Sequence, residues 1–343
     1  MSGPPEGGPH DCTAATGGPP SGGPECRVGY PRGVSLARKL LLAASTNAWL
    51  RDHATRTTFV RRSVSAFMPG ERLEDALTAA RAQELLGIGT IFTHLGENVA
   101  QVEDARTVAA HYVTVMDAVQ AAGLNAQVAV KPTHLGLDID ADLAGEHLQQ
   151  LVRHAEATSS FVWLDMESSP YVDPTIDLFR QLRQRSSRVG VALQAYLYRT
   201  AEDIERLLPL GAAIRLVKGA YLEAPTVAFP SKRDVDQNFF TLACRLLGAE
   251  AVAAGGLLHI ATHDAALVDR VQAFIATHRV PRSAYEFAML YGIQRPLQTR
   301  LVSGGAPLRV LIAYGPHWFP WYMRRLAERP ANVAFVLKNL VAR

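Results

Sequence analysis

Apolar runs of strand length alternate with longer stretches of helical periodicity along most of the chain. Eight such runs begin near Gly89, Ala126, Phe161, Val189, Ala213, Leu257, Ala284 and Leu308. Between them, apolar residues recur every three or four positions, which is the spacing of one face of a helix. The predicted helices cover residues 101–122, 140–156, 172–185, 201–210, 235–254 and 264–278, with a shorter one at 292–302. Because a tight turn cannot join two parallel strands, this alternation predicts a parallel sheet with helical crossovers.

Eight strand–helix units have the number and length of a closed (β/α)8 TIM-type barrel. We therefore predict that residues 87–343 form the barrel, with the last helix capping its mouth, and that residues 34–86 form N-terminal helices. Residues 1–33 are too rich in Gly and Pro to pack a core, which predicts a disordered tail. An open, doubly wound sheet is the alternative. However, no predicted strand precedes a G-x-G-x-x-G motif, and GIGTIF at residues 87–92 departs from it after two glycines.

Composition narrows the function classes. The chain has 343 residues, a net charge of +3 and no run of Lys or Arg longer than two, which argues against nucleic acid as a partner. Its three cysteines are far apart and match no zinc spacing, as is typical of proteins from a reducing compartment. No apolar run reaches the ~20 residues of a membrane-spanning helix. These features predict a cytoplasmic protein.

Two histidines raise the question of metal binding. His259 and His263 lie on one face of a predicted strand, but four residues at roughly 3.3 Å each separate them too far for one shared ion. No HxH or HExxH motif accompanies them. We therefore predict no metal site.

Polar residues collect at the carboxyl ends of the predicted strands, where barrel enzymes place their active sites. They are Lys131, Asp165, Glu167, Gln194, Arg215, Lys218, Tyr221, His263 and Asp264. Strand alternation directs Arg215 to the same face as Val217 and Gly219. A buried guanidinium is costly unless it meets an anion, so Arg215 indicates either an anionic ligand or an internal ion pair with Asp165.

Other members of this set also have structural interpretations. Lys131 precedes Pro132 and could be the exposed first residue of a loop, and Gln194 could be a hydrogen-bonding core residue. Gly219 either lets the backbone approach a ligand or forms a tight turn. Asp264 suits the N-cap of the following helix, and a helix N-terminus also binds anions. The residues alone leave these alternatives open.

The segment WYMRRLAERPANV at residues 321–333 places two arginines side by side near the C-terminus. Prolines bound a short helix here. Neighbouring helix positions are about 100° apart, so Arg324 and Arg325 could flank one anion beneath the helix. The alternative is a solvent-exposed face on which Arg324 pairs with Glu328.

Seven motifs follow one another at about one per predicted barrel unit. They are VKPTHLGLD (130–138), LDMESS (164–169), LQAYLYRT (193–200), IRLVKGAY (214–221), ATHD (261–264), YEFAMLYG (285–292) and WYMRRLAERPANV. As an ordered set, they resemble the short, monofunctional bacterial proline dehydrogenases, over about residues 34–343. The resemblance implies a flavin-dependent barrel that oxidises L-proline to Δ1-pyrroline-5-carboxylate, with FAD bound non-covalently.

The resemblance also implies the partners of the reaction. A hydride would pass to flavin N5 and the electrons then to a membrane quinone, which predicts a peripheral position on the inner face of the cell membrane. Functional coupling to a pyrroline-5-carboxylate dehydrogenase is a further expectation from the family.

Roles follow from the resemblance at each matching position. The FAD would be lined by Met166, Gln194, Val217, Lys218, Gly219, Thr262 and His263. Arg215 would lie near flavin N5, where its charge would stabilise accumulating electron density. The proline carboxylate would be bound by Lys131, Arg324 and Arg325, with Asp165 and Tyr221 close to the proline ring. Glu97, in HLGE at 94–97, would pair with Arg324 as a gate when the site closes.

Two departures from the family pattern leave other functions open. Trp321 stands where the family usually has tyrosine, so 4-hydroxyproline or another cyclic imino acid is an alternative substrate. Glu223, in KGAYLEAP, has no role that the resemblance assigns.

Two alternative functions come from other classes. One is a barrel lyase that forms a Schiff base on Lys131 or Lys218, and the other is a proline-sensing barrel without enzyme activity.

Overall fold

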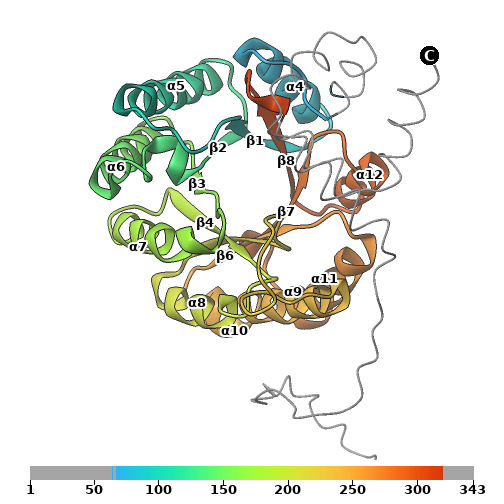
Figure 1. Ribbon diagram of the computed structural model, residues 1–343. Coiled ribbons are helices and arrows are strands. Elements are labelled where there is room, and N and C mark those ends of the chain that lie inside the picture. The colour runs from blue at the N-terminus through green and yellow to red at the C-terminus, as the bar shows by residue number, and fades with distance from the viewer. Residues whose placement is uncertain (1–63, 65–66, 320–343) are drawn as a thin grey trace, which may run out of the picture.

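The computed structural model describes residue 64 and residues 67–319, in which eight parallel strands form a closed barrel (Figure 1). The strands are β1 (Gly89–His94), β2 (Ala126–Val130), β3 (Val162–Leu164), β4 (Val189–Gln194), β5 (Ala213–Val217), β6 (Leu257–Ala261), β7 (Tyr285–Leu290) and β8 (Leu308–Tyr314). Each strand pairs with the next, and β8 also pairs with β1, from Gly89 opposite Arg309 to His94 opposite Tyr314. The carboxyl ends of all eight strands therefore lie on one side of the barrel.

Helices surround the barrel (Figure 1). They are α4 (Leu73–Glu84), α5 (Val102–Ala121), α6 (Ala141–Ala157), α7 (Val172–Arg183), α8 (Thr200–Leu207), α9 (Lys232–Leu246), α10 (Ala249–Ala253), α11 (Ala265–His278) and α12 (Arg295–Ser303). The 3-10 turns are η1 (Pro132–Leu135), η2 (Ser169–Tyr171), η3 (Leu208–Leu210) and η4 (Arg282–Ala284). Within the described residues, no helix is both long enough and apolar enough to cross a bilayer.

The predicted (β/α)8 barrel is confirmed, and the open doubly wound sheet is wrong. Every predicted strand is present and begins within one residue of the predicted position. The single helix predicted at 235–254 is wrong, because Gly248 has an extended backbone, with ψ of 159°, and divides it into α9 and α10. The helix predicted at 201–210 ends at Leu207, since Pro209 cannot supply the N–H that would continue it.

Parts of the prediction lie outside the described residues. These parts are the tail at 1–33, most of the helical segment at 34–86, and the capping helix with Trp321, Arg324 and Arg325. Among the described residues of the segment 34–86, α4 forms a helix of several turns.

Side chains of non-adjacent strands meet inside the barrel. Trp163 of β3 is fully buried, and its ring centroid lies 4.2 Å from that of His259 on β6. The guanidinium carbon of Arg215, on β5, lies 5.3 Å from the Trp163 ring centroid. Since β3 is adjacent to neither β5 nor β6, these contacts cross the lumen. Gly190 on β4 makes room for the indole, because a Cβ there would come within 2.5 Å of a ring atom.

Candidate active site

The predicted site residues that the structure describes lie where the strands end, at what we call the barrel mouth: the segments that follow each strand. Gln194 and Val217 are the last residues of β4 and β5, and Arg215 lies within β5. The others follow a strand closely: Glu97 after β1, Lys131 after β2, Asp165 and Met166 after β3, Lys218, Gly219 and Tyr221 after β5, and Thr262 and His263 after β6. A parallel barrel brings all of these positions to one end of the molecule.

An ion pair between Arg215 and Asp165 lies inside the barrel, near the carboxyl end of β3. Arg215 is only 3% exposed, and one guanidinium nitrogen, Nη2, donates to Asp165 Oδ1. Burial lowers the pKa of the guanidinium, and the Asp165 carboxylate opposes that effect. The second terminal nitrogen, Nη1, is buried and has no hydrogen-bond partner among the described residues. The internal ion pair weighed from the sequence is therefore present, and it satisfies only part of the arginine.

Lys131 faces the loop that follows β1. Its Nζ donates to the Gly96 carbonyl oxygen at 3.1 Å and lies 3.9 Å from Glu97 Oε2. The Lys131 side chain is 14% exposed, so it is not the solvent-exposed loop residue that the sequence left as an alternative. In the described residues, Glu97 thus has Lys131 as a charged neighbour, whereas its predicted partner, Arg324, lies outside them.

Glu167 is a buried acid beside these residues. It is 2% exposed, and its two carboxylate oxygens accept hydrogen bonds from the Thr133 N–H at 3.1 Å and the Thr133 hydroxyl at 2.6 Å. Burial raises the pKa of Glu167 to about 7, although the bonds from Thr133 and the charge of Lys131 act in the opposite direction. This carboxyl therefore titrates near neutral pH.

Gln194 and Gly219 lie at the mouth, beside Met166 and Tyr196. Gln194 Nε2 donates to the Met166 carbonyl at 3.3 Å, but Gln194 Oε1 is buried without a hydrogen-bond partner among the described residues. Gly219 has a φ of +116°, and a Cβ at this position would lie 2.2 Å from the Tyr196 ring. Backbone strain and close packing both require glycine here. An acceptor without a donor is costly inside a protein, so Gln194 Oε1 is available to a donor from a ligand or from an ordered water.

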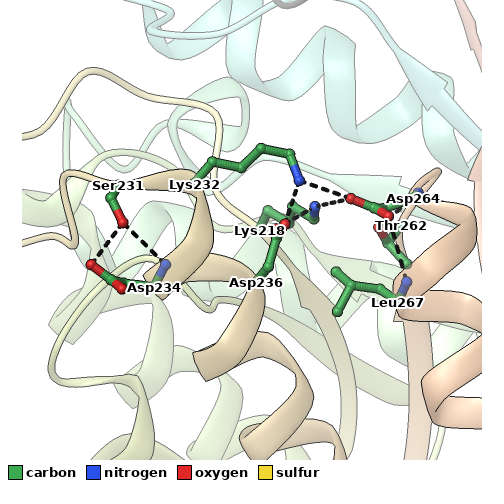
Figure 2. A network of polar contacts seen from close by, with 8 residues as sticks. All are labelled: Lys218, Ser231, Lys232, Asp234, Asp236, Thr262, Asp264 and Leu267. Carbon is green, nitrogen blue, oxygen red and sulfur yellow. Dashed lines mark hydrogen bonds and ion pairs between the residues drawn. The ribbon is translucent and has the colours of Figure 1, made fainter. Parts of the chain in front are cut away.

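Lys218 belongs to an ion-pair network at the start of α9 and α11 (Figure 2). Its Nζ donates to Asp236 Oδ1 at 2.5 Å and to Asp264 Oδ2 at 3.0 Å. Lys232 also contacts both acids, which closes a group of two cations and two anions. Asp264 additionally accepts from the Leu267 N–H, so it is the helix N-cap that the sequence suggested. The network joins the segments after β5 and β6.

The segment after β6 supplies two further predicted residues. Thr262 is buried, and its hydroxyl accepts from the Asp264 N–H at 3.2 Å. His263 Nε2 accepts from the Leu290 N–H at 2.8 Å, whereas His259 Nε2 lies 2.9 Å from Glu286 Oε2. The two histidines therefore have separate partners, and the part of the chain that the structure describes contains no group of three or more His, Cys, Asp or Glu residues suited to a metal ion.

Sequence reasoning missed a histidine cluster beside Lys131. The rings of His94 and His134 stack at 5.7 Å, and His111 lies 4.5 Å from His94. Burial lowers the pKa of His94 to about 4 and of His134 to about 3. These imidazoles are neutral at physiological pH and add no charge near Lys131. No periodic signal marks them, because they come from β1, α5 and η1.

Comparison with known proteins supports the family resemblance. The model of the family "Proline dehydrogenase" matches residues 76–338. Proline dehydrogenase 1 of Bacillus subtilis (strain 168) is 36% identical over 307 residues, which are 89% of this chain and 99% of that protein. Proline dehydrogenase of Deinococcus radiodurans is 38% identical over 280 residues, which are 80% of this chain and 89% of that protein.

Solved structures support the fold. Proline utilization A (PutA) from Bdellovibrio bacteriovorus, inactivated by N-propargylglycine, matches with a TM-score of 0.74 and 20% identity over 87% of this chain. PutA from Bradyrhizobium japonicum matches with a TM-score of 0.66 and 22% identity over 78% of this chain. The match spans 36% and 31% of those two longer chains, respectively. With the family match over most of its length, the chain belongs to the proline dehydrogenase family, whose members are oxidoreductases of proline catabolism.

Proposed function

We propose that this enzyme oxidises L-proline to Δ1-pyrroline-5-carboxylate and uses non-covalently bound FAD as its cofactor. The observation that carries the proposal is the Arg215–Asp165 pair, a charged group in the barrel lumen that keeps a buried nitrogen without a partner among the described residues. Burying a guanidinium costs several kcal/mol of desolvation, and a ligand that accepts a hydrogen bond from Nη1 would offset part of that cost. A flavin edge and an amino-acid substrate are ligands that would use it.

The donors and acceptors at the mouth fit FAD. Gln194 Oε1 offers a buried acceptor to a flavin N–H, and Arg215 Nη1 offers a buried donor. We propose that FAD is held by these two residues together with Met166, Val217, Lys218, Gly219, Thr262 and His263. When bound, FAD supplies the acceptor for the two electrons removed from proline.

The substrate would be bound mainly through its carboxylate. Lys131 supplies one ammonium group, and we propose that Arg324 and Arg325 supply two guanidinium forks from the C-terminal helix, which lies outside the described residues. Hydrogen bonds to a charged group contribute about 1.5–3 kcal/mol each, so three such donors would hold a small zwitterion firmly. The Lys131–Glu97 contact would open or re-pair as Arg324 reaches Glu97 and the site closes.

Asp165 and Tyr221 would act on the ring of the substrate. Oxidation at the carbon beside nitrogen needs the nitrogen lone pair, so the ammonium group of proline must first lose a proton. We propose that Asp165, directly or through a water, accepts this proton at its carboxylate. The charge of Arg215 keeps that carboxylate oriented in the lumen.

A membrane quinone is the proposed final electron acceptor, and a pyrroline-5-carboxylate dehydrogenase the proposed next enzyme. Both proposals come from the family. We therefore propose that the enzyme acts in the cytoplasm, at the inner face of the membrane.

Two other reactions are weaker candidates. A Schiff-base lyase needs an uncharged lysine amine, whereas Lys218 donates to two carboxylates, as an ammonium group does. Lys131 likewise donates to a carbonyl beside an acid. Oxidation of hydroxyproline uses the same chemistry, and Trp321 is the residue on which a preference between the two substrates would depend.

The absorbance spectrum of the purified enzyme tests the proposal. We expect a flavin spectrum that bleaches when L-proline is added without oxygen, and that bleaches more slowly with 4-hydroxyproline. A colourless protein that is trapped by borohydride with a carbonyl substrate would support the lyase instead. A protein that binds proline without any spectral change would support the proline sensor.

A further inference from the structure

Two glutamates at the barrel mouth make the same kind of contact with neighbouring loops. Glu167 accepts from the N–H and the hydroxyl of Thr133, at 3.1 and 2.6 Å. Glu223 accepts from the N–H and the hydroxyl of Ser169, both at 2.7 Å. In each case both oxygens of one carboxylate hold one residue of another loop by its backbone and its side chain. We call these contacts the Glu167 clamp and the Glu223 clamp.

The clamp residues stand at fixed distances in sequence from the proposed substrate residues. Thr133 is two residues after Lys131, Glu167 two after Asp165, and Glu223 two after Tyr221. Two residues of chain span at most about 7 Å, so a displacement of the clamp residue moves its neighbour as well. Each clamp therefore joins two loops close to the residues that would contact proline.

The Glu167 clamp extends to the loop after β1. The Asn98 N–H donates to the Thr133 hydroxyl oxygen at 3.1 Å, while that hydroxyl donates to Glu167. Asn98 has a left-handed backbone, with φ of 54°, and its side chain donates to Asp138 at 2.8 Å. Glu97 immediately precedes Asn98. The loops after β1, β2, β3 and β5 are thus joined in one series, and the β3 loop belongs to both clamps.

We propose that Glu167 and Glu223 are positioning residues, which through their clamps set the spacing of Lys131, Asp165 and Tyr221 around the substrate. The inference rests on the proposed function of those three residues. Neither glutamate needs to touch proline. Each acts by keeping the loops in their binding-competent arrangement, so that loss of a clamp lowers the population of that arrangement and weakens the apparent affinity for substrate.

Glu223→Gln is the variant that tests the inference. It retains the shape of the side chain but removes the charge of the carboxylate, so the two bonds to Ser169 lose the extra strength that an ionised acceptor gives them. Glu223 is only half-buried, so the fold should tolerate the change. If the competent population falls to about a tenth, KM for proline rises about tenfold while kcat changes much less. Ser169→Ala should have a smaller effect in the same direction, and Ser169→Thr should retain wild-type KM.

A matched control separates positioning from stability. Glu205 makes an equally close two-oxygen contact with Arg245, at 2.7 and 2.7 Å, between the outer helices α8 and α9. Glu205→Gln removes the same charge by the same chemistry and should leave KM unchanged. Glu167→Gln is the companion variant in the buried clamp, and the midpoint of thermal unfolding is recorded for every protein.

Binding without turnover provides the second measurement. Tetrahydrofuran-2-carboxylate retains the ring and carboxylate of proline but replaces the nitrogen by oxygen, so calorimetry reports its Kd on the intact holoenzyme. For Glu223→Gln we expect the Kd to rise in parallel with KM, with the midpoint of unfolding close to that of wild type. A lower midpoint with unchanged KM and Kd would overturn the inference and leave the clamps a purely structural role. If wild-type enzyme neither oxidises proline nor binds the analogue, the proposed function itself fails, and the inference with it.

Discussion

Two buried arginines lie in the same barrel, one toward the mouth and one near the start of a strand. Arg215, toward the mouth, meets Asp165 and keeps Nη1 without a partner among the described residues. Arg309, near the start of β8, donates through Nε to Glu286 at 2.6 Å and through Nη1 to the Asn125 carbonyl at 3.2 Å. Gly89 leaves room for it, since a Cβ there would lie 2.8 Å from Nη1. An arginine with internal partners at both ends of its fork is structural, whereas one with an open nitrogen is available to a ligand.

A buried glutamate at the mouth and a half-buried glutamate near Arg309 show the same contrast in their pKa values. Burial raises the pKa of Glu167, at the mouth, to about 7. Burial also acts to raise the pKa of Glu286, but the hydrogen bond from His259 and the charge of Arg309 outweigh it and lower the pKa to about 2. The end of the barrel opposite the mouth neutralises its charges internally. At the mouth, by contrast, the carboxyl group of Glu167 has a pKa close to neutral pH.

The largest effect is expected from Arg215→Met, which removes the guanidinium at the mouth. Loss of one preorganised donor at a reacting centre lowers rates by about 10²–10³-fold, so we expect a fall of that size in kcat/KM for proline. Flavin content and the rate of anaerobic flavin reduction are the measurements. Normal values for both would remove Arg215 from the proposed site.

Arg324→Ala and Arg325→Ala test the proposed carboxylate site from the C-terminal segment. Each removes a hydrogen bond to a charged group, so KM for proline should rise by about 10–100-fold, with kcat changed much less. Steady-state kinetics over a wide range of proline concentration measure both parameters. A collapse of kcat at constant KM would contradict the carboxylate role.

Arg309→Met should act on stability and spare catalysis. It leaves the half-buried Glu286 without its main cation, which lowers the free energy of unfolding by about 3 kcal/mol. Urea denaturation measures the loss, and KM and kcat should stay at wild-type values. Adding Glu286→Leu should recover part of the stability, because no unpaired charge then remains. A kinetic defect as large as that of Arg215→Met would show that Arg309 also acts in catalysis and would contradict its structural role.

The last prediction concerns how the free energy of unfolding depends on pH through Glu167. The pKa of Glu167 is about 7 in the folded enzyme, whereas that of a free glutamate side chain is 4.5, so between these pH values the folded state binds more protons than the unfolded state. The wild-type free energy of unfolding should therefore decrease relative to Glu167→Gln as pH rises from 4.5 to 7, by about 3 kcal/mol at most. Lys131 and Glu97 face this carboxyl with opposite effects on its pKa. Chemical denaturation at several pH values measures the difference, and parallel stability curves would contradict it.

Much of the fold could be predicted because strand and helix periodicities report which residues are buried. The eight strand starts and the closed barrel came from this pattern, and the polar residues at strand ends marked the mouth. Arg215 could be singled out because a cation in a strand of buried apolar residues is costly. The break at Gly248 was missed, since one glycine within a helical pattern changes the periodicity very little.

The partners of the site residues could not be predicted in the same way. Glu223 and Ser169 are 54 positions apart, and Glu167 and Thr133 are 34 apart. Lys218 shares Asp236 with Lys232 from another element. Nothing local distinguishes these acids from exposed ones.

The sequence by itself determined the order of elements, the parallel barrel and the set of residues at its mouth, because each depends on local periodicity and on chain connectivity. The tertiary structure alone decided which charge faces which, because side-chain pairing depends on strand register and loop path. These bring residues of distant segments within 3 Å of one another, and they leave Gln194 Oε1 and Arg215 Nη1 without partners among the described residues.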